Sequence, residues 1–345
     1  MIVLTVGLLG SHCEGAISCK NENGDNVDWF ILYKKPDGFN YFYIDSTDQN
    51  LKENNKDKPV NHQAGVLAHT LGPYFESSPD FGFIAYNDQT PSCNALTEYG
   101  HSKGVVMMDK ENVVWLLHST PKFPERDKSN NFYPDSGKRN AQIFMCVTLP
   151  SDKSAQIGQH LKDINAHIFK EHNPEKFKDS STAPQPLPYD NDLWSAGGQK
   201  FKHFVKQISK ESKDGDLYVT IADTLESNLY IQTWRSDPKD LNKRPLSKTN
   251  KGYKLDTIIK VGTAAGTWEH GSDHSKWCVS DSKDWMCVGD SNREPSQFER
   301  PGGALCINSK DVADAFKGIT KDIAKDSKRT GSPQNPSIPV KKKGG

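Results

Sequence analysis

The sequence has no excess of charge of either sign: its 345 residues include 44 Lys and Arg and 44 Asp and Glu, a formal net charge of zero at pH 7. Proteins that hold a polyanion at neutral pH usually carry a basic excess, so the composition gives no support for such binding at that pH. Eleven histidines are present. Because an unperturbed histidine titrates near about pH 6.5, the surface would become positive in acid, and a polyanion would bind better there.

The sequence also lacks cysteine pairs at metal-binding spacing, since none of its seven cysteines forms a Cys-x-x-Cys pair. A zinc site of the usual spacing is therefore not supported, and we expect neither a metal nor another cofactor. Six cysteines follow residue 15. An even number in an exported chain is typical of three disulfides.

Apolar runs long enough to cross a membrane are absent too. Residues 2–10 are apolar but too short to span a bilayer. Small residues and then polar sequence follow directly, so we interpret residues 1–15 as a signal peptide, although the segment lacks an N-terminal Lys or Arg and could instead be a buried strand. We expect no membrane partner.

Short runs rich in β-branched and aromatic residues predict strands, and longer segments with apolar residues at helical spacing predict helices. The predicted strands are Trp29–Tyr33, Tyr41–Ile44, Gly104–Met108, Val113–His118, Ile143–Val147, Leu217–Ile221, Leu229–Trp234, Trp277–Val279 and Trp285–Val288. The predicted helices are Ser154–Lys170, Gln199–Ile208 and Asp311–Ile323, the last with Ser309 as N-cap. Mixed strands and helices favour an α/β or α+β layered fold.

Proline-rich polar sequence divides the chain. Residues 171–190 hold four prolines among many polar residues, which is typical of a linker or long loop. We therefore expect an N-terminal half at 16–170 and a C-terminal half at 191–328. The Gly, Ser and Pro-rich residues 329–345 predict a disordered tail.

One tripeptide occurs twice. His101-Ser102-Lys103 and His274-Ser275-Lys276 each precede or begin a predicted strand, one in each half. Residues i and i+2 of a strand point to the same face, so each motif places an imidazole beside an ammonium. A single copy is most simply an ordinary polar strand end, but two copies at matching positions predict two similar halves that share one cleft.

Two such His-x-Lys pairs supply what cleavage of a phosphodiester requires without a metal: a nucleophile, an acid for the leaving oxygen and positive charge for the phosphate. One histidine would attack phosphorus and form a phosphohistidine. The other would protonate the leaving alkoxide and then activate water. A neutral nucleophile and a protonated acid must coexist, which fits acidic pH if the environment separates their pKa values.

Several further blocks carry a resemblance to a known family. They are Trp29 with Tyr33-Lys34-Lys35-Pro36, His101–Val105 followed by Trp115–Pro121, Gly197-Gly198-Gln199, Asp273–Ser280, Trp285–Arg293 and Gly302–Cys306. This ordered set resembles the deoxyribonuclease II family from about residue 18 to residue 324. The fold and the His-Lys chemistry of that family are related to phospholipase D.

The resemblance implies a phospholipase D-like α/β fold of mixed sheets, in which two similar halves, each a central sheet flanked by helices, pack as a pseudo-dimer. It implies a lysosomal or secreted acid endonuclease, metal-independent, that cuts double-stranded DNA and leaves 3′-phosphate and 5′-hydroxyl ends. His101, Lys103, His274 and Lys276 would be catalytic, with His101 as nucleophile and His274 as general acid. The chain would act as a monomer or a homodimer.

Three further residues are weaker candidates. His118 matches an active-site position of the family, but it is equally well interpreted as a histidine of the core or of a strand edge. Asp290 and Asn292 lie in a Gly-Asp-x-Asn turn, where they either orient a catalytic histidine, contact phosphate or only form the turn.

The resemblance also implies two disulfides, Cys19–Cys146 and Cys287–Cys306. Cys93 and Cys278 are then left over, and we hypothesise that they pair with each other. The sequence departs from the family at Pro301, which stands where the family has a glycine in Arg-Gly-Gly-Gly. Proline removes a backbone donor, so contacts made by that amide would be lost.

Two other functions compete with the nuclease. A family member with little nuclease activity could act as a DNA-binding or effector protein. A lipid phosphodiesterase is the third interpretation, because phospholipase D motifs carry an aspartate five residues after the lysine. Asp281 matches that position after Lys276, but Met108 stands there after Lys103.

Overall fold

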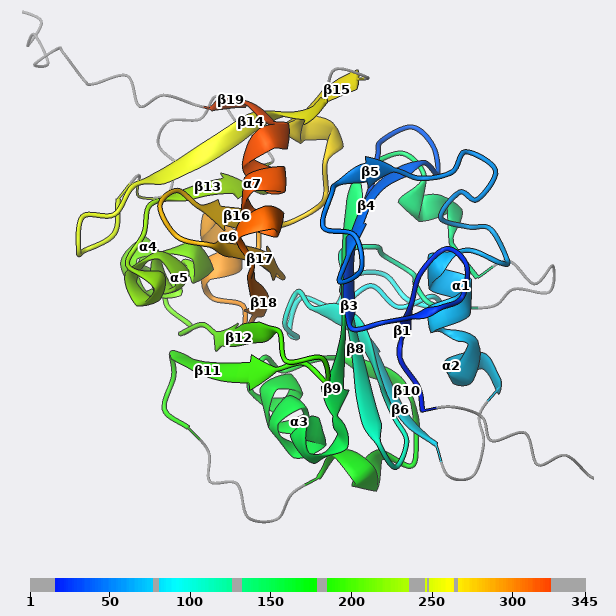
Figure 1. Ribbon diagram of the computed structural model, residues 1–345. Helices are drawn as coiled ribbons and strands as arrows, with labels where there is room; N and C mark the ends of the chain where they lie inside the picture. Colours follow the sequence, from blue (N-terminus) through cyan, green and yellow to red (C-terminus); the bar gives the residue numbers. More distant parts are fainter. Residues whose placement is uncertain are drawn as a thin grey trace, which may run out of the picture.

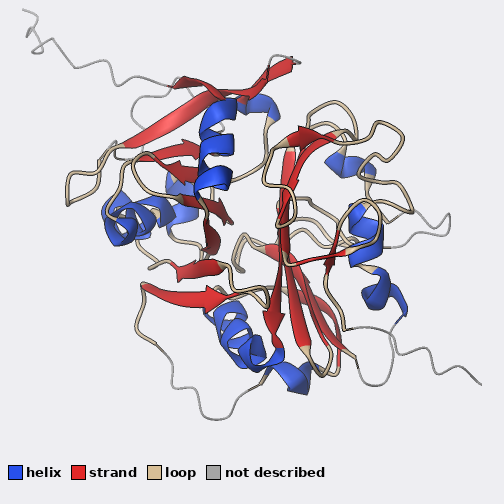
Figure 2. Ribbon diagram, viewed as in Figure 1, coloured by secondary structure: helices blue, strands red, loops and turns tan. Residues whose placement is uncertain are grey.

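Two large sheets occupy most of the chain in the computed structural model, which describes residues 16–76, 81–125, 132–178, 185–235, 246, 248–263 and 266–323. The signal peptide expected at residues 1–15 and the tail expected at 329–345 lie outside these residues. Figure 1 shows the first sheet on the right and the second on the left. With short helices around them (Figure 2), the sheets form the mixed α/β fold that the sequence predicts.

The first sheet has 8 strands, each antiparallel to its neighbours. Its central strands are continuous apolar runs, as expected where both faces are covered. Across the sheet the strands are β10 (Ile168–His172), β6 (Gly82–Asn87), β7 (Lys103–Met108), β8 (Asn112–His118), β9 (Gln142–Pro150), β3 (Trp29–Lys34), β4 (Tyr41–Asp45) and β5 (Lys52–Glu53). A separate small sheet pairs β1 (Cys19–Lys20) with β2 (Asn26–Val27).

The second sheet has 9 strands and is antiparallel except where β13 pairs with β14. Across this sheet the strands are β11 (Tyr189–Trp194), β12 (Lys200–Val205), β18 (Gly303–Asn308), β17 (Trp285–Gly289), β16 (Trp277–Ser280), β13 (Leu229–Gln232), β14 (Leu255–Thr263) and β15 (Gly266–Glu269), with β19 (Thr320–Ile323) also on β14.

The helices are short and pack against the faces of the two sheets. They are α1 (Val66–Thr70), α2 (Gly72–Glu76), α3 (Ser154–Asp163), α4 (Ser212–Gly215), α5 (Leu217–Leu225), α6 (Pro295–Phe298) and α7 (Lys310–Ile319). Single 3-10 turns are η1 (Asp135–Gly137), η2 (Ser151–Lys153), η3 (Pro174–Phe177) and η5 (His270–Ser272). Ser309 caps α7 as predicted, since its hydroxyl accepts the amide of Val312. No described helix has the length and apolar character needed to cross a membrane.

The strand pairing makes the two sheets equivalent around the repeated tripeptide. Lys103 begins β7, which lies between β6 and β8, and Lys276 directly precedes β16, which lies between β13 and β17. If β7 and β16 are taken as equivalent strands, their neighbours on each side are equivalent too. By this pairing β6 corresponds to β13, β8 to β17, β9 to β18 and β3 to β12. The two similar halves expected from the sequence are therefore present as two related sheets.

One hydrophobic cluster joins the two sheets. It contains side chains of β3, β8 and β9 together with side chains of β16, β17, β18 and α7. At its centre Phe316 of α7 stacks on Tyr33 of the first half, 6.3 Å between ring centroids, and meets Trp277 of the second half edge-on at 5.0 Å. Each fully buried ring of this kind contributes about 1.5–3 kcal/mol, so the two halves share one core.

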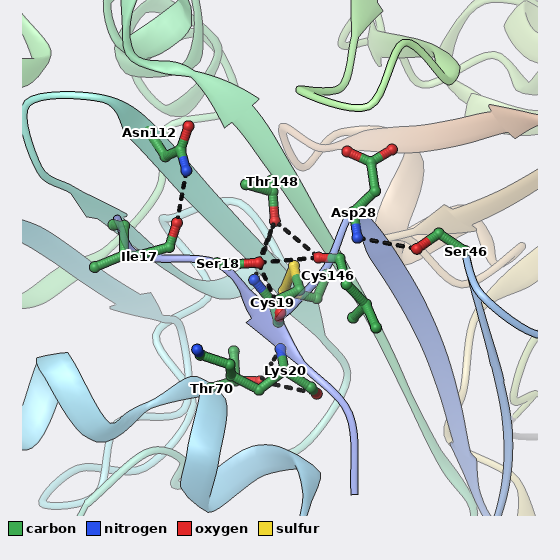
Figure 3. The surroundings of a disulfide bond; sticks show 11 residues. Ile17, Ser18, Cys19, Lys20, Asp28, Ser46, Thr70, Asn112, Cys146 and Thr148 are labelled. Atoms are coloured by element: carbon green, nitrogen blue, oxygen red, sulfur yellow. Dashed lines mark hydrogen bonds between the residues drawn. A yellow bond between two sulfur atoms is a disulfide. The ribbon is translucent and has the colours of Figure 1, made fainter. Parts of the chain in front are cut away.

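Both disulfides implied by the resemblance are present. Cys19 pairs with Cys146 and ties β1 to β9 (Figure 3), and Cys287 pairs with Cys306 across β17 and β18. Beside the first bridge, the backbone amide of Cys19 donates a hydrogen bond to the hydroxyl of Thr148 of β9 at 3.0 Å. The hypothesis that Cys93 pairs with Cys278 is wrong, as is a third bridge: both thiols are free, one exposed and one buried.

Two predicted elements have the opposite secondary structure. Gln199–Ile208 was expected to be helical, but Lys200–Val205 is strand β12. Phe201, His203 and Val205 are buried, and Lys200 and Lys202 alternate with them and pair with carboxylates of β11. That is a period of two, which a helix cannot satisfy. Leu217–Ile221 was expected to be a strand, but it belongs to α5, whose N-cap is Asp216.

Other predicted boundaries moved because strands take up the ends of helices. The helix expected at Ser154–Lys170 ends at Asp163, since Ile168–His172 pairs with β6 as β10. The helix expected to reach Ile323 ends at Ile319, since β19 pairs with β14. The expected linker at 171–190 has ordered ends, including η3 and the start of β11.

Candidate active site

The two His-Ser-Lys motifs come together where the two sheets meet. Lys103 and Lys276 are both buried, at 3% and 5% exposure. The ammonium of Lys276 contributes to lowering the pKa of His101, and that of Lys103 to lowering the pKa of His274. Each motif is therefore within electrostatic reach of the other, as the repeated tripeptide predicts.

Asp88 holds the first motif in place. Its side chain is fully buried, its Oδ2 lies 2.7 Å from Nδ1 of His101, and its Oδ1 accepts a hydrogen bond from Nζ of Lys103. Burial raises the pKa of Asp88, but Lys103 and His101 more than offset this and hold the pKa well below its usual range. A carboxylate only accepts, so Nδ1 of His101 carries the hydrogen and Nε2 keeps a free lone pair.

Arg300 brings the second half to the same carboxylate. Its Nη2 donates to Oδ2 of Asp88 at 3.1 Å and to the carbonyls of Leu96 and Tyr99 at 3.1 and 2.8 Å. Asp88 thus has two cationic neighbours, Lys103 and Arg300, and the imidazole of His101 as a third partner.

Asp88 was not predicted as a site residue from the sequence, and Arg300 was considered only as part of a glycine-rich run. A signal for Asp88 existed. It follows the buried strand β6 directly, next to Asn87, which pairs with Lys103. An acidic residue at the end of a strand that pairs with the motif strand is a candidate partner for the motif.

The side chain of Arg300 takes over the hydrogen bond that a backbone amide at Pro301 would make. Across the pseudo-symmetric interface, Ala141 donates its amide to the carbonyl of Ser272 at 2.9 Å. Pro301 is the counterpart of Ala141 and has no amide hydrogen. The carbonyl of Tyr99, which is the counterpart of Ser272, instead accepts from Nε and Nη2 of Arg300 at 3.1 and 2.8 Å. The departure from the family pattern is therefore compensated by the residue that precedes it.

The second motif has a different environment. The register makes Trp234 the counterpart of Asp88, and its ring lies 5.6 Å from that of His274. No hydrogen bond to either ring nitrogen of His274 exists within the described part of the chain. Burial, with the nearby Lys276 and Lys103, lowers the pKa of His274 to about 4. His101 is buried more deeply, and burial with Lys103 lowers its pKa to about 3.

The backbone of His274 is held from both sides. Its amide donates to the carbonyl of Ala141 at 3.0 Å, and its carbonyl accepts from Nζ of Lys276 at 2.9 Å. The preceding Asp273 is fully buried and accepts from Tyr33 of the first half and from Nε1 of Trp268 at 2.8 Å. This network fixes the second motif against the first sheet.

Asp290 and Lys276 are the site groups that titrate nearest neutrality. Burial raises the pKa of Asp290 to about 7, although the amide of Gly303 donates to its Oδ2 at 3.0 Å. Burial and the charge of Lys103 lower the pKa of Lys276 to about 7. Below that pH the site has a net positive charge, which suits an anionic phosphate.

The remaining candidates lie around this centre. His118, the last residue of β8, is buried edge-on against Phe123, at 4.9 Å between centroids, and stacked on Phe144. Burial, with the charge of Lys103, holds the pKa of His118 well below its usual range. Asn292 has a buried Oδ1 that no hydrogen bond engages among the described residues.

Asp281, the residue that matches the phospholipase D spacing, lies at the opposite end of β16 from Lys276. It is exposed and accepts a hydrogen bond from the hydroxyl of Tyr230 at 3.1 Å. In the first half, Asp109 caps the turn between β7 and β8. Neither carboxylate contacts a motif histidine in the described structure.

The acidic groups of the site are already engaged. Asp88 is bound by cations, Asp273 by Tyr33 and Trp268, and Asp290 by a backbone amide. In the described part of the chain, no three His, Cys, Asp or Glu side chains gather as a metal-ligand set.

A hollow of about 450 Å³ opens beside His274. Arg139 and Asn140, which precede β9, line one side, and Glu269, Gly271, Ser272 and His274 line the other. Both halves of the chain thus contribute to its walls.

The sequence is similar to known proteins over most of its length. The family model described as deoxyribonuclease II matches residues 18–326. The chain is 30% identical to deoxyribonuclease-2-beta of Homo sapiens over 346 residues, which is 92% of this chain and 94% of that protein. It is 33% identical to deoxyribonuclease-2-beta of Mus musculus over 338 residues, 90% and 92% of the two chains. It is 31% identical to plancitoxin-1 of Acanthaster planci over 347 residues, 92% and 94% of the two chains.

Proposed function

The chain belongs to the deoxyribonuclease II family, and we propose that it is an acid, metal-independent endonuclease that cuts double-stranded DNA and leaves 3′-phosphate and 5′-hydroxyl ends. One observation carries the proposal. Two buried His-Lys pairs from equivalent strands converge, and within the described part of the chain a carboxylate binds His101 but none binds His274.

That asymmetry assigns the two roles. Asp88 fixes the Nδ1–H tautomer of His101, so Nε2 keeps a free lone pair and acts as the nucleophile. No carboxylate among the described residues holds His274 in one tautomer, so this histidine can give up a proton and take it back. Lys103 and Lys276 neutralise the non-bridging oxygens of the phosphate.

The reaction has two steps. Nε2 of His101 attacks phosphorus, the bond from phosphorus to the 5′-oxygen breaks, and His274 protonates the departing 5′-oxygen. The 3′-phosphoryl group is then carried on His101. Neutral His274 removes a proton from water, the water oxygen attacks phosphorus, and the bond to Nε2 breaks, which releases the 3′-phosphate and frees His101.

The pKa values of the two histidines lie in the order that these roles require. The nucleophile must be neutral and the acid protonated, and the pKa of His101, about 3, lies below that of His274, about 4. Both forms therefore coexist in acid. A phosphate bound between the lysines offsets part of their charge and raises both pKa values, which extends the active range upward.

One chain is enough to build this site, because each half contributes one motif, and we propose that the protein works as a monomer. An acid optimum suits a lysosome or an acidic extracellular space, so we place the protein there, in accord with the expected signal peptide.

The test is cleavage of supercoiled plasmid at pH 5 in EDTA. We expect the parent protein to relax and linearise the plasmid, and His101→Ala and His274→Ala to lose at least about 10³-fold in rate. His62→Ala, in a loop of the first half away from the motifs, is the matched control and should cut like the parent. No cleavage by a folded parent, or full activity in either motif variant, would refute the mechanism.

A further inference from the structure

One residue that lines the hollow beside His274 has a longer counterpart in the other half. The pairing of β8 with β9 and of β17 with β18 makes Arg300 the counterpart of Asn140, and Tyr99 that of Ser272. Arg300 extends beside His101 and binds Asp88 and two carbonyls. Asn140 is shorter, and the matching space beside His274 stays open. The hollow therefore lies on the side of the site where the shorter residue stands.

Some of the polar side chains that line this hollow have no interaction with other side chains in the described part of the protein. The guanidinium of the exposed Arg139 has no hydrogen-bond or ion-pair partner among the described residues. The Glu269 carboxylate and the Asn140 amide face the same space. A planar cation, a carboxylate and an amide together suit a ligand with a flat ring and polar edges.

We propose that this hollow is the subsite for the nucleoside on the leaving side of the scissile phosphate, the one released with a free 5′-hydroxyl. The assignment rests on the proposed function, in which His274 protonates that oxygen. The group attached to the oxygen must lie against His274, and the hollow is the space there. Its volume of about 450 Å³ is within the range of small-ligand sites. Arg139 would stack on the base or bind its edge.

The subsite predicts a specific split between two substrates. Thymidylyl-(3′,5′)-thymidine and thymidine 3′-(methyl phosphate) undergo the same reaction, and they differ only in whether a nucleoside or methanol departs. Binding energy from a remote part of a substrate raises the rate at the reacting centre. We expect kcat/KM of the parent to be at least about 10²-fold higher for the dinucleotide, measured by chromatography at pH 5 in EDTA.

Arg139→Ala tests the lining residue. We expect kcat/KM for the dinucleotide to fall about 10-fold or more, and kcat/KM for the methyl ester to change less than about 2-fold. Lys138→Ala is the matched control, because it removes a positive charge from the adjacent position, where the ammonium lies over the Phe39 ring, outside the hollow. It should leave both substrates unaffected.

The outcomes separate the two proposals. If the parent cuts neither substrate while folded, the proposed function fails. If the parent cuts both equally well, or if Arg139→Ala slows both by the same factor, the nuclease stands and the subsite is overturned. A selective loss for the dinucleotide in Arg139→Ala, with none in Lys138→Ala, supports it.

Discussion

Single residues distinguish two His-Ser-Lys motifs that are identical in sequence. Asp88 and Trp234 occupy equivalent positions after equivalent strands, yet one is an anion bonded to His101 and the other an indole ring beside His274. A fixed tautomer favours nucleophilic attack, and an unrestrained ring favours proton exchange. The two catalytic roles that we propose therefore differ because the partners of the two histidines differ.

Asp88→Asn should test that role without altering shape. The amide keeps the volume but removes the charge that fixes His101 and pairs with Lys103, so we expect kcat to fall roughly 10²-fold or more with KM nearly unchanged. Asp281→Asn is the matched control, since Asp281 is exposed and follows the phospholipase D spacing. A normal kcat in Asp88→Asn would contradict the positioning role. A large loss in Asp281→Asn would favour the lipid-type motif.

The pH dependence should show two separate proton losses. As pH rises through about 4, free His274 loses the proton it must donate, and log kcat/KM falls with a slope of about −1. As pH rises through about 7, Lys276 loses its charge and the slope steepens to about −2.

Lys276→Arg isolates the second loss. Arginine stays protonated throughout this range, so its profile should keep a slope of about −1 to pH 8, at a lower overall rate because the guanidinium is larger. Measurement of kcat/KM from pH 4 to 8 for both proteins decides the matter. A bend at neutral pH that persists in Lys276→Arg would show that another group is responsible.

At the scale of elements, two buried lysines hold equivalent loops. Lys34, at the end of β3, donates to the carbonyls of Lys35 and Lys138 at 2.6 and 3.0 Å. Its counterpart Lys206, after β12, donates to the carbonyls of Gln207 and Phe298 at 3.3 and 2.7 Å.

These two loops, before β9 and before β18, carry Arg139 and Arg300 to the site. Burial lowers the pKa of Lys34 to about 7 and that of Lys206 to about 8. Burial of a lysine ammonium is tolerated when the ammonium donates hydrogen bonds to carbonyls that would otherwise have no donor.

Lys206→Met should destabilise the protein. Methionine leaves the Phe298 carbonyl without its donor, and an unsatisfied buried carbonyl costs about 1–3 kcal/mol. Urea unfolding monitored by tryptophan fluorescence measures the change, with Lys56→Met on an exposed loop as the control. Equal stability of the two variants would mean that the loop before β18 does not depend on Lys206.

At the scale of the whole molecule, the reactivity of the thiols shows which cysteines are free and which form disulfides. Cys93 is exposed, and Cys278 is buried in the core of the second half, where burial raises the pKa of its thiol. In a chain that begins after residue 15, iodoacetamide should add one label to the native protein and two after unfolding without reductant. Reduction should raise the total to six. Intact mass reads the count, and zero labels in the unfolded, unreduced protein would restore the Cys93–Cys278 bridge.

The sequence alone determined the two His-x-Lys motifs, their placement at equivalent strand ends, the two disulfides through the family resemblance, and the mixed α/β class. Each of these features depends on residues that are close together in the sequence or on a repeated motif, so the linear sequence is enough to identify it. Strand β12 and helix α5 were misassigned because burial and cross-strand pairing outweighed the propensity of Gln199–Ile208 and Leu217–Ile221.

The tertiary structure decided what lies against each motif. Asp88 is 13 residues from His101, and Arg300 is 212 residues from Asp88, so no spacing rule connects them. Contacts of this kind arise only when two sheets pack around a shared core, because strand register and the interface between the halves fix which side chains meet. The sequence therefore specified the chemical groups of the site, and packing specified their partners and the hollow beside His274.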